Sequence, residues 1–307
     1  MSVGQRETPS TADRVRYFVS LIVWPGLLAT ALVLTGLGMT TNSPILAFNA
    51  VYIGFALTVG VLERLMPHEQ AWLKDDKQTF ANLAHTLLNK GVVQVLVVVV
   101  ATVGIAGAVQ PEAGSTDGLW PGAWPMLLQV VLGLFIAEFG LYWAHRLAHE
   151  IPYIWRFHAV HHSVTRLWFI NTGRFHFVDS IFSIVLSQPL LFLLGAPMEV
   201  FLWVSAVTAF VGILTHANIE ARTGPINFVL NTPGLHRWHH SMDLVEGNSN
   251  YGENLMVWDL IFGTYFDADR RPPVEIGIEG PMSPSFVGQL VQPFKQEGRQ
   301  ETPSGAP

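Results

Sequence analysis

The sequence predicts an all-α integral-membrane protein, a bundle of four to six transmembrane helices with a histidine-rich cap that holds two metal ions. Composition is the first reason, because 50% of the 307 residues are hydrophobic and 13% are charged, whereas a soluble domain carries about 25% charged residues. The second reason is that the apolar residues gather in long uninterrupted stretches. The third is that eight of the twelve histidines fall into three short clusters.

Four apolar stretches approach the length of about 20 residues that a helix needs to cross a bilayer. Residues 18–37, 45–62 and 91–109 contain no charged residue, and residues 124–144 contain only Glu138. Four such stretches in a short chain leave too little polar surface to cover them, so we expect membrane spans rather than buried soluble helices. Residues 74–90 have the pattern of an amphipathic helix that leads into the third span.

Two further apolar stretches, residues 180–197 and 200–215, are shorter, and Pro189 interrupts the first. They fit either a full transmembrane hairpin or a hairpin that enters and leaves through one leaflet, and the full hairpin is preferred. This choice decides whether the protein has the upper or the lower number of membrane helices.

The distribution of Lys and Arg predicts the orientation of the chain. Residues 38–44 and 110–123 contain neither, whereas the segments on the opposite side carry many. Because positively charged loops stay in the cytoplasm, we expect a cytoplasmic N-terminus. The same rule places every histidine cluster on the cytoplasmic side.

The three histidine clusters have the spacing of metal ligands on helices. Residues three and four apart share one face of a helix, and neutral imidazole is a good ligand for transition metals. Eight such ligands exceed the four of a structural zinc site, which favours two metal ions with open positions. The clusters consist of His145 and His149; His158, His161 and His162; and His236, His239 and His240.

Composition excludes several classes of protein. The chain has no cysteine, so disulfides and thiolate-ligated iron–sulfur clusters are excluded. Its net charge is −6 and it contains no basic run, which argues against nucleic-acid binding.

The order of the histidine motifs resembles that of the fatty acid hydroxylase/sterol desaturase superfamily. The resemblance covers residues 77–266. It departs from the common pattern in having Glu138 where Asp is more frequent and Phe177 where Pro often follows a histidine. The matching segments are EFGLYWAHRLAHE, WRFHAVHHS, TGRFHFVD, LTHANIE, GLHRWHHS and NYGENLMVWDLIFGTYF.

The resemblance implies two Fe ions as cofactor, O2 as co-substrate and a C–H bond of a membrane lipid (a sterol, a fatty acyl chain or an alkyl lipid) as the target of hydroxylation or desaturation. It implies electrons from a separate donor protein of ferredoxin or cytochrome type. It also adds His216 and His176 to the eight clustered histidines as candidate metal ligands.

Three further residues are candidates for hydrogen bonds that orient the ligands. Glu138 lies seven residues, or two helical turns, before His145, and a carboxylate within a membrane helix is costly enough to suggest a function. We expect it to accept a hydrogen bond from an imidazole. Tyr142 lies between them on the same face, and Asp179 follows His176 by three positions.

Two alternatives remain at this stage, a histidine-rich membrane metal-binding or transport protein and a zinc-dependent membrane hydrolase. The hydrolase lacks support because HRLAH has Arg146 where the HExxH motif has its catalytic Glu.

We expect residues 1–270 to form a single domain, with the histidine motifs within residues 145–240. Residues 271–307 are expected to form a Pro-rich, partly disordered tail.

Overall fold

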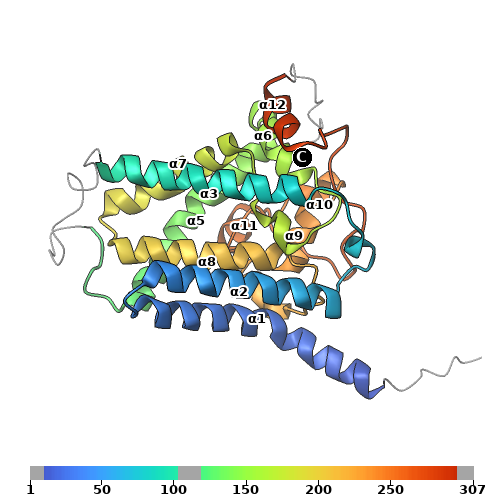
Figure 1. The fold of residues 1–307 in the computed structure, drawn as a ribbon, viewed down its shortest axis with the longest axis horizontal. Helices are drawn as coiled ribbons and strands as arrows, with labels where there is room; N and C mark the ends of the chain where they lie inside the picture. Colours follow the sequence, from blue (N-terminus) through green and yellow to red (C-terminus); the bar gives the residue numbers. More distant parts are fainter. Residues whose placement is uncertain (1–9, 103–118, 296–307) are drawn as a thin grey trace, which may run out of the picture.

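The computed structural model describes residues 10–102 and 119–295, and within them every regular element is a helix. Figure 1 shows the long helices side by side, with short helices and loops gathered toward one end of the bundle. Five helices are long and apolar enough to span a membrane. They are α1 (Thr11–Met39), α2 (Pro44–Leu65), α5 (Met126–Glu150), α7 (Phe177–Leu194) and α8 (Met198–His216).

A sixth long helix, α3 (Thr79–Thr102), joins two elements that the sequence analysis kept separate. It contains most of the expected amphipathic helix and the first part of the expected third span, whose residues 103–109 lie outside the described residues. The helix begins at Thr79 rather than residue 74. The side chains of Asp75 and Asp76 accept hydrogen bonds from the backbone of Lys77 and Gln78, and this turn precedes the first helical residue.

Helices α7 and α8 form the hairpin for which the sequence allowed either a full crossing of the membrane or a return within one leaflet. Gly195 ends α7 in the left-handed conformation, with φ of 80°, which glycine adopts at little cost. Pro197 immediately precedes α8, at a position where no helical hydrogen bond needs the backbone N–H that proline lacks. Both helices, of 18 and 19 residues, are long enough to cross the membrane, so the structure supports the full hairpin.

Two clusters of apolar side chains hold the long helices together. Phe55 of α2 packs edge-on against Phe210 of α8, with ring centroids 5.0 Å apart, in the cluster shared with α1. Leu191 and Val200 belong to the cluster between α5, α7 and α8. Helices α5 and α7 approach closely at Gly140, where an added Cβ atom would lie 2.1 Å from the carbonyl oxygen of Leu186.

The cap consists of short elements between and after the long helices. They are α6 (Pro152–His162), α9 (Pro233–His239), α10 (Leu244–Gly247), α11 (Val257–Phe262), α12 (Phe286–Lys295) and the 3-10 turns Ala71–Leu73, Phe169–Gly173 and Gly224–Phe228. Helix α12 contacts α3 and α6, and buried Gln289 bonds to His85 of α3. Part of the C-terminal tail is therefore a packed helix.

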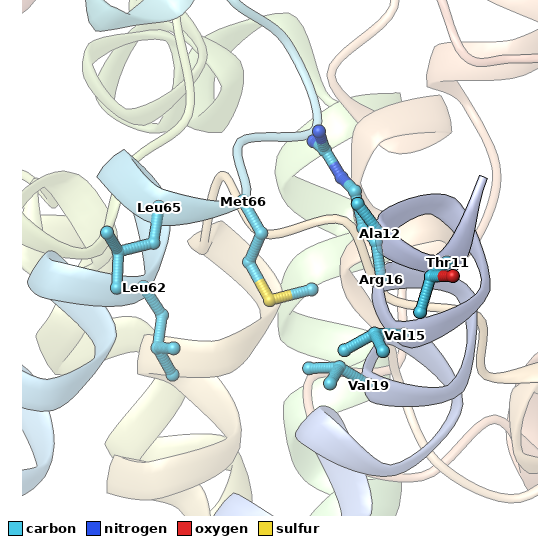
Figure 2. A pocket seen from close by; sticks show the side chains of 8 residues that line it. All are labelled: Thr11, Ala12, Val15, Arg16, Val19, Leu62, Leu65 and Met66. Carbon is cyan, nitrogen blue, oxygen red and sulfur yellow. The ribbon is translucent and has the colours of Figure 1, made fainter.

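An open apolar groove lies between the start of α1 and the end of α2, with a volume of about 500 Å³ (Figure 2). Val15, Leu62 and Met66 line it, and Arg16 is the charged residue on its wall. None of its lining residues is a histidine, so the groove is separate from the metal-ligand clusters.

Candidate metal centre

The histidines come from four helix ends that meet at one end of the bundle. His145 and His149 occupy the last turns of α5, and Pro152 starts α6 two residues after α5 ends. Because Ile151 caps both helices, the chain turns sharply and places the histidines of α6 beside those of α5. His216 ends α8, and α9 with its capping residue His240 supplies the last cluster.

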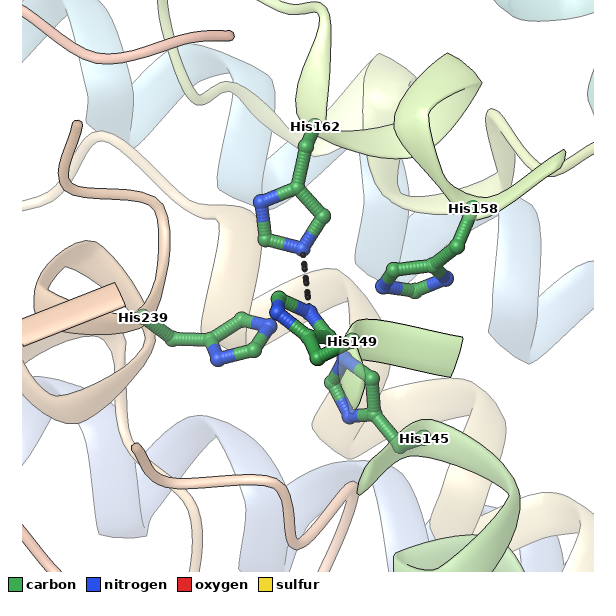
Figure 3. Close-up of side chains that lie close together, drawn as sticks. All are labelled: His145, His149, His158, His162 and His239. Atoms are coloured by element: carbon green, nitrogen blue, oxygen red, sulfur yellow. Dashed lines mark hydrogen bonds between the residues drawn. The ribbon is translucent and has the colours of Figure 1, made fainter. Parts of the chain in front are cut away.

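The structure divides nine histidines into two groups. Within each group, every histidine offers a ring nitrogen that lies within 4.8 Å of those of the others. The first group, drawn in Figure 3, contains His145, His149, His158, His162 and His239. The second group contains His161, His216, His236 and His240.

Each HxxHH motif contributes to both groups. The residues four apart, His158 with His162 and His236 with His240, stay together, while the histidine between them joins the other group. The reason is helical geometry, since adjacent residues of a helix point about 100° apart. The two motifs therefore link the groups, because each supplies two histidines to one group and one histidine to the other.

The ring nitrogens have the arrangement that metal ions require. Two imidazole nitrogens bound to one ion at about 2.1 Å and at a right angle lie about 3 Å apart. The Nε2 atoms of His149 and His162 are 3.1 Å apart. In the second group, His236 Nε2 lies 2.9 Å from His216 Nε2 and 3.1 Å from His240 Nε2.

Burial keeps the histidines in the form that binds metal. Removal from water, followed by the neighbouring histidines, holds the pKa of His161, His162, His239 and His240 well below the usual value. They are therefore neutral at pH 7, with a lone pair free for an ion. A group of neutral imidazoles fits a transition metal better than it fits a hard cation.

Three histidines of the first group are oriented by acceptors outside the group. Nδ1 of His158 donates to Asp179 Oδ2 at 2.8 Å, and Nδ1 of His145 and of His239 lie 2.8 and 2.7 Å from the carbonyl oxygens of Tyr251 and Ser249. Nε2 of each of the three is buried and has no hydrogen-bond partner in the described part of the chain. Such atoms are expected where an absent ion would bind.

In the second group, a side-chain amide outside the group makes the hydrogen bond that orients a histidine. Nδ1 of His216 lies 2.9 Å from Asn171 Oδ1, and Asn171 donates from its amide nitrogen to the carbonyl oxygen of Arg166. This second contact fixes which amide atom faces the histidine. Asn171 was not among the predicted site residues, although it directly precedes the TGRFHFVD motif.

Glu138 makes contacts other than those expected. Its carboxylate accepts hydrogen bonds from the backbone N–H groups of Glu253 and Asn254 and from the side-chain amide of Asn254. Among the residues that the structure describes, it bonds to no imidazole. The same loop presents the Tyr251 carbonyl to His145, so Glu138 is connected to His145 through the loop backbone.

Tyr142 holds the same loop through a second chain of hydrogen bonds. Its hydroxyl lies 3.0 Å from Thr264 Oγ1, which donates to Asp259. Asp259 in turn accepts from the backbone N–H groups of Tyr251 and Gly252. Gly252 fits here because an added Cβ would lie 2.3 Å from the carbonyl oxygen of Leu255.

The structure does not bring His176 to either group. Its Nδ1 accepts from the N–H of Val178 at the start of α7, and its Nε2 donates to the carbonyl oxygen of Leu290 in α12 at 3.1 Å. Since both nitrogens are engaged, we omit His176 from the proposed ligands. His68 bonds to Glu220, also away from the groups.

Fold and site together define an integral-membrane protein with two adjoining histidine groups that could each hold a metal ion. The sequence profile of the fatty acid hydroxylase family matches residues 130–264. Ornithine lipid hydroxylase OlsE of Rhizobium tropici is 50% identical over 293 residues, which cover 95% of this chain and 88% of that protein. The chain belongs to the fatty acid hydroxylase superfamily.

Two more relatives are similar over about half of the chain. Alkylglycerol monooxygenase of Xenopus tropicalis is 33% identical over 164 residues, 53% of this chain and 35% of that protein. Fatty acid hydroxylase vlmA of a Lecanicillium species is 30% identical over 170 residues, 50% of this chain and 46% of that protein. No solved structure matches the chain.

These relationships establish the class of enzyme. The chain is a metal-dependent lipid oxygenase, because its relatives are hydroxylases and monooxygenases and its histidines form sites able to hold metal. The transporter and zinc-hydrolase alternatives are not favoured.

Proposed function

We propose that this protein hydroxylates a membrane lipid of the ornithine-lipid type at a centre of two irons. One observation carries the metal part of the proposal. The two histidine groups adjoin one another through the HxxHH motifs, and all of their histidines except the half-buried His149 are buried. The relative that is 50% identical over nearly the whole chain, an ornithine lipid hydroxylase, supports the substrate.

The proposed iron ligands are the nine histidines of the two groups. Two bound irons would supply the redox chemistry in which a C–H bond, O2, two electrons and two protons give an alcohol and water. The protein contributes neutral imidazoles of fixed orientation, and Asp179 and the carbonyl oxygens of Ser249 and Tyr251 maintain that orientation. Burial of the nitrogens keeps bulk water from the reacting atoms.

The electrons, on this proposal, come from a separate donor of ferredoxin or cytochrome type. The chain has no cysteine for an iron–sulfur cluster of its own. We favour hydroxylation over desaturation because the three relatives described above are named as hydroxylases or monooxygenases.

We also propose that the N-terminus and both histidine groups face the cytoplasm. The histidine-bearing ends of α5 and α8 lie at the same end of the bundle as the start of α1, and the loops near them hold most of the Lys and Arg. Residues 1–270 would act as one catalytic domain, with α12 of the tail packed on it.

Expression in a bacterial host that makes ornithine lipid but lacks a hydroxylase tests the proposal. We expect ornithine lipid that has gained one oxygen atom, and purified protein with close to two irons per chain. Replacement of His161 by Ala should abolish the product while leaving membrane insertion intact. Zinc alone after growth in iron-rich medium, or product lacking two hydrogens instead of gaining oxygen, would contradict the iron hydroxylase.

A further inference from the structure

Glu63 is a buried carboxylate in the last turn of α2, where its side chain is 4% exposed. Its Oε1 atom accepts hydrogen bonds from the backbone N–H of Phe169 at 2.8 Å and from the backbone N–H of Asn218 at 2.9 Å. A carboxylate within a membrane helix is costly unless it is satisfied in this way. Because the two N–H groups belong to segments far apart in the sequence, this one oxygen fixes the position of each segment relative to the other.

Both segments lead directly to the second histidine group. Phe169 begins the 3-10 turn that contains Asn171, and Oδ1 of Asn171 lies 2.9 Å from Nδ1 of His216. Asn218, the other partner of the carboxylate, lies two positions after His216. Glu63 therefore holds the backbone on both sides of the contact that orients this histidine.

The segment after His216 is also bonded to the helix that carries the last histidine cluster. The guanidinium group of Arg237 donates to the carbonyl oxygens of Ala217 and Ile219, at 2.8 and 3.1 Å. Arg237 directly follows His236, whose Nε2 lies 2.9 Å from Nε2 of His216. The segment is thus held both by the carboxylate of α2 and by the guanidinium group of α9.

The end of α2 makes two further contacts with these segments. The backbone N–H of Glu69 donates to the side-chain oxygen of Asn218, whose amide donates back to the Glu69 carbonyl oxygen, each at 2.9 Å. Gly60, one turn before the carboxylate, leaves room for the ring of Phe169, because an added Cβ would lie 2.7 Å from Cε1 of that ring. Helix α2 lies outside residues 130–264, which the family profile matches. The second histidine group is therefore supported by a part of the chain that the profile does not include.

We propose that Glu63 is a positioning residue for the second histidine group and keeps His216 and Asn171 in the arrangement that lets His216 bind a metal ion. The inference rests on the metal part of the proposed function, but it does not depend on which substrate is oxidised. The two N–H groups require an acceptor atom at the end of a side chain of this length, and a full charge is a lesser requirement. One of the two metal ions should therefore depend on α2, and the other should not.

Two substitutions separate the length of this side chain from its charge. Glu63→Asp keeps the charge but is one methylene shorter, so its carboxylate cannot reach both N–H groups, whereas Glu63→Gln keeps the length and an acceptor oxygen. Visible absorption of Co²⁺, a divalent ion that imidazoles bind, reports binding to the full-length protein in detergent after a chelator has removed its metal. We expect wild type to bind two equivalents. Glu63→Asp should weaken one of them about tenfold or more and leave the other within about twofold, and Glu63→Gln should stay within about threefold at both.

Double variants identify which of the two sites is weakened. Asn171→Ala removes the hydrogen bond to His216 in the second group, and Asp179→Asn weakens the hydrogen bond to His158 in the first. Because Glu63 and Asn171 act on the same histidine, Glu63→Asp combined with Asn171→Ala should lose much less affinity than the two single losses multiplied together. Glu63→Asp combined with Asp179→Asn should instead weaken both sites, each by the factor of its own single variant. Multiplied losses in the first pair would contradict the proposal.

Glu199→Gln serves as the control, because Glu199 is exposed at the start of α8, at the opposite end of that helix from His216. This variant should bind both equivalents as wild type does. Thermal unfolding shows whether each full-length variant is folded. If folded Glu63→Asp binds both equivalents as tightly as wild type and only unfolds at a lower temperature, Glu63 merely joins the helices and the proposal is overturned.

Gly60→Val decides the question if Glu63→Asp does not fold. The added side chain would displace the ring of Phe169, and with it the N–H that bonds to Glu63. The same single equivalent of Co²⁺ should then bind more weakly. Tight binding of both equivalents by folded Gly60→Val would overturn the proposal.

The Co²⁺ measurement separates this proposal from the proposed function, because it requires no turnover. Selective weakening of one equivalent in Glu63→Asp supports the positioning role even if no lipid is oxidised, in which case the proposed reaction alone fails. Lipid hydroxylation by wild type, with both equivalents equally tight in Glu63→Asp, keeps the reaction and rejects the role of Glu63. Wild type that binds fewer than two equivalents contradicts both the centre of two metal ions and this inference.

Discussion

His158 and Asp179 form a buried pair in which Nδ1 lies 2.8 Å from Oδ2. The histidine belongs to α6 in the cap and the aspartate to the first turn of α7 in the bundle. The carboxylate accepts the Nδ1 proton, so Nε2 is left with a lone pair that could bind a metal ion. One hydrogen bond thus fixes both the tautomer of the ligand and the position of the cap on the membrane helices.

Replacement of Asp179 by Asn should weaken metal binding. The amide cannot accept the Nδ1 proton as strongly as the carboxylate, and loss of such an outer contact typically costs about 10- to 100-fold in metal affinity. Competition with a chelator of known affinity, with iron counted per chain, measures the change. The exposed residue Asp269 provides the control variant Asp269→Asn. Equal iron retention by Asp179→Asn and wild type would show that the pair is not needed for the site.

His239 and His176 should respond oppositely to replacement by Ala. His239 lies in the first group with Nε2 unpartnered, so His239→Ala should lose metal and all product. His176 instead joins α7 to α12, so His176→Ala should keep its iron but loosen α12. Iron analysis and limited proteolysis of the C-terminal segment distinguish the two outcomes. Iron loss in His176→Ala with α12 still protected would return His176 to the ligand set.

The sequence predicts the membrane helices and the histidines because both depend on local patterns. An apolar stretch such as residues 45–62 is recognisable by length alone, and the spacing of His158 and His162 places them on one helix face. The split of the motifs into two groups was not predicted. It depends on how α6 and α9 face each other across the site, which spacing within one helix does not specify.

The hydrogen bonds that the site histidines make to residues outside the two groups were harder to predict, for two physical reasons. His145 and His239 bond to backbone carbonyl oxygens, and a carbonyl group is present in every residue. Glu138 is a carboxylate within a membrane helix, and it lies on the same helix face as His145, so a hydrogen bond between the two was expected. Its oxygens instead accept hydrogen bonds from the N–H groups of Glu253 and Asn254. A loop more than 100 residues later in the chain decides this contact.

The contact between Glu138 and Asn254 should tolerate an exchange of chemical groups. In Glu138→Gln the Asn254 amide can turn over, because its Oδ1 has no hydrogen-bond partner in the described part of the chain, so a donor still meets an acceptor and only the charge of the contact is lost. Asn254→Asp would instead place two carboxylates together, at a cost of about 1–3 kcal/mol in the free energy of unfolding. The double variant restores one donor and one acceptor with the charge unchanged. We therefore expect a higher unfolding temperature and more product from it than from Asn254→Asp alone, and strictly additive losses would argue against the contact.

The orientation of the protein can be tested with single cysteines, because the natural chain has none. Ser43 is exposed in the turn between α1 and α2 and makes no side-chain cap to α2. Val245 is 77% exposed in α10, beside the histidine groups. If the histidines face the cytoplasm, a membrane-impermeant maleimide should label Ser43→Cys in spheroplasts, and Val245→Cys only after the membrane is opened. Both variants should retain hydroxylation, which shows that they are inserted correctly. The reverse labelling would place the histidines outside the cytoplasm and so exclude a cytoplasmic electron donor.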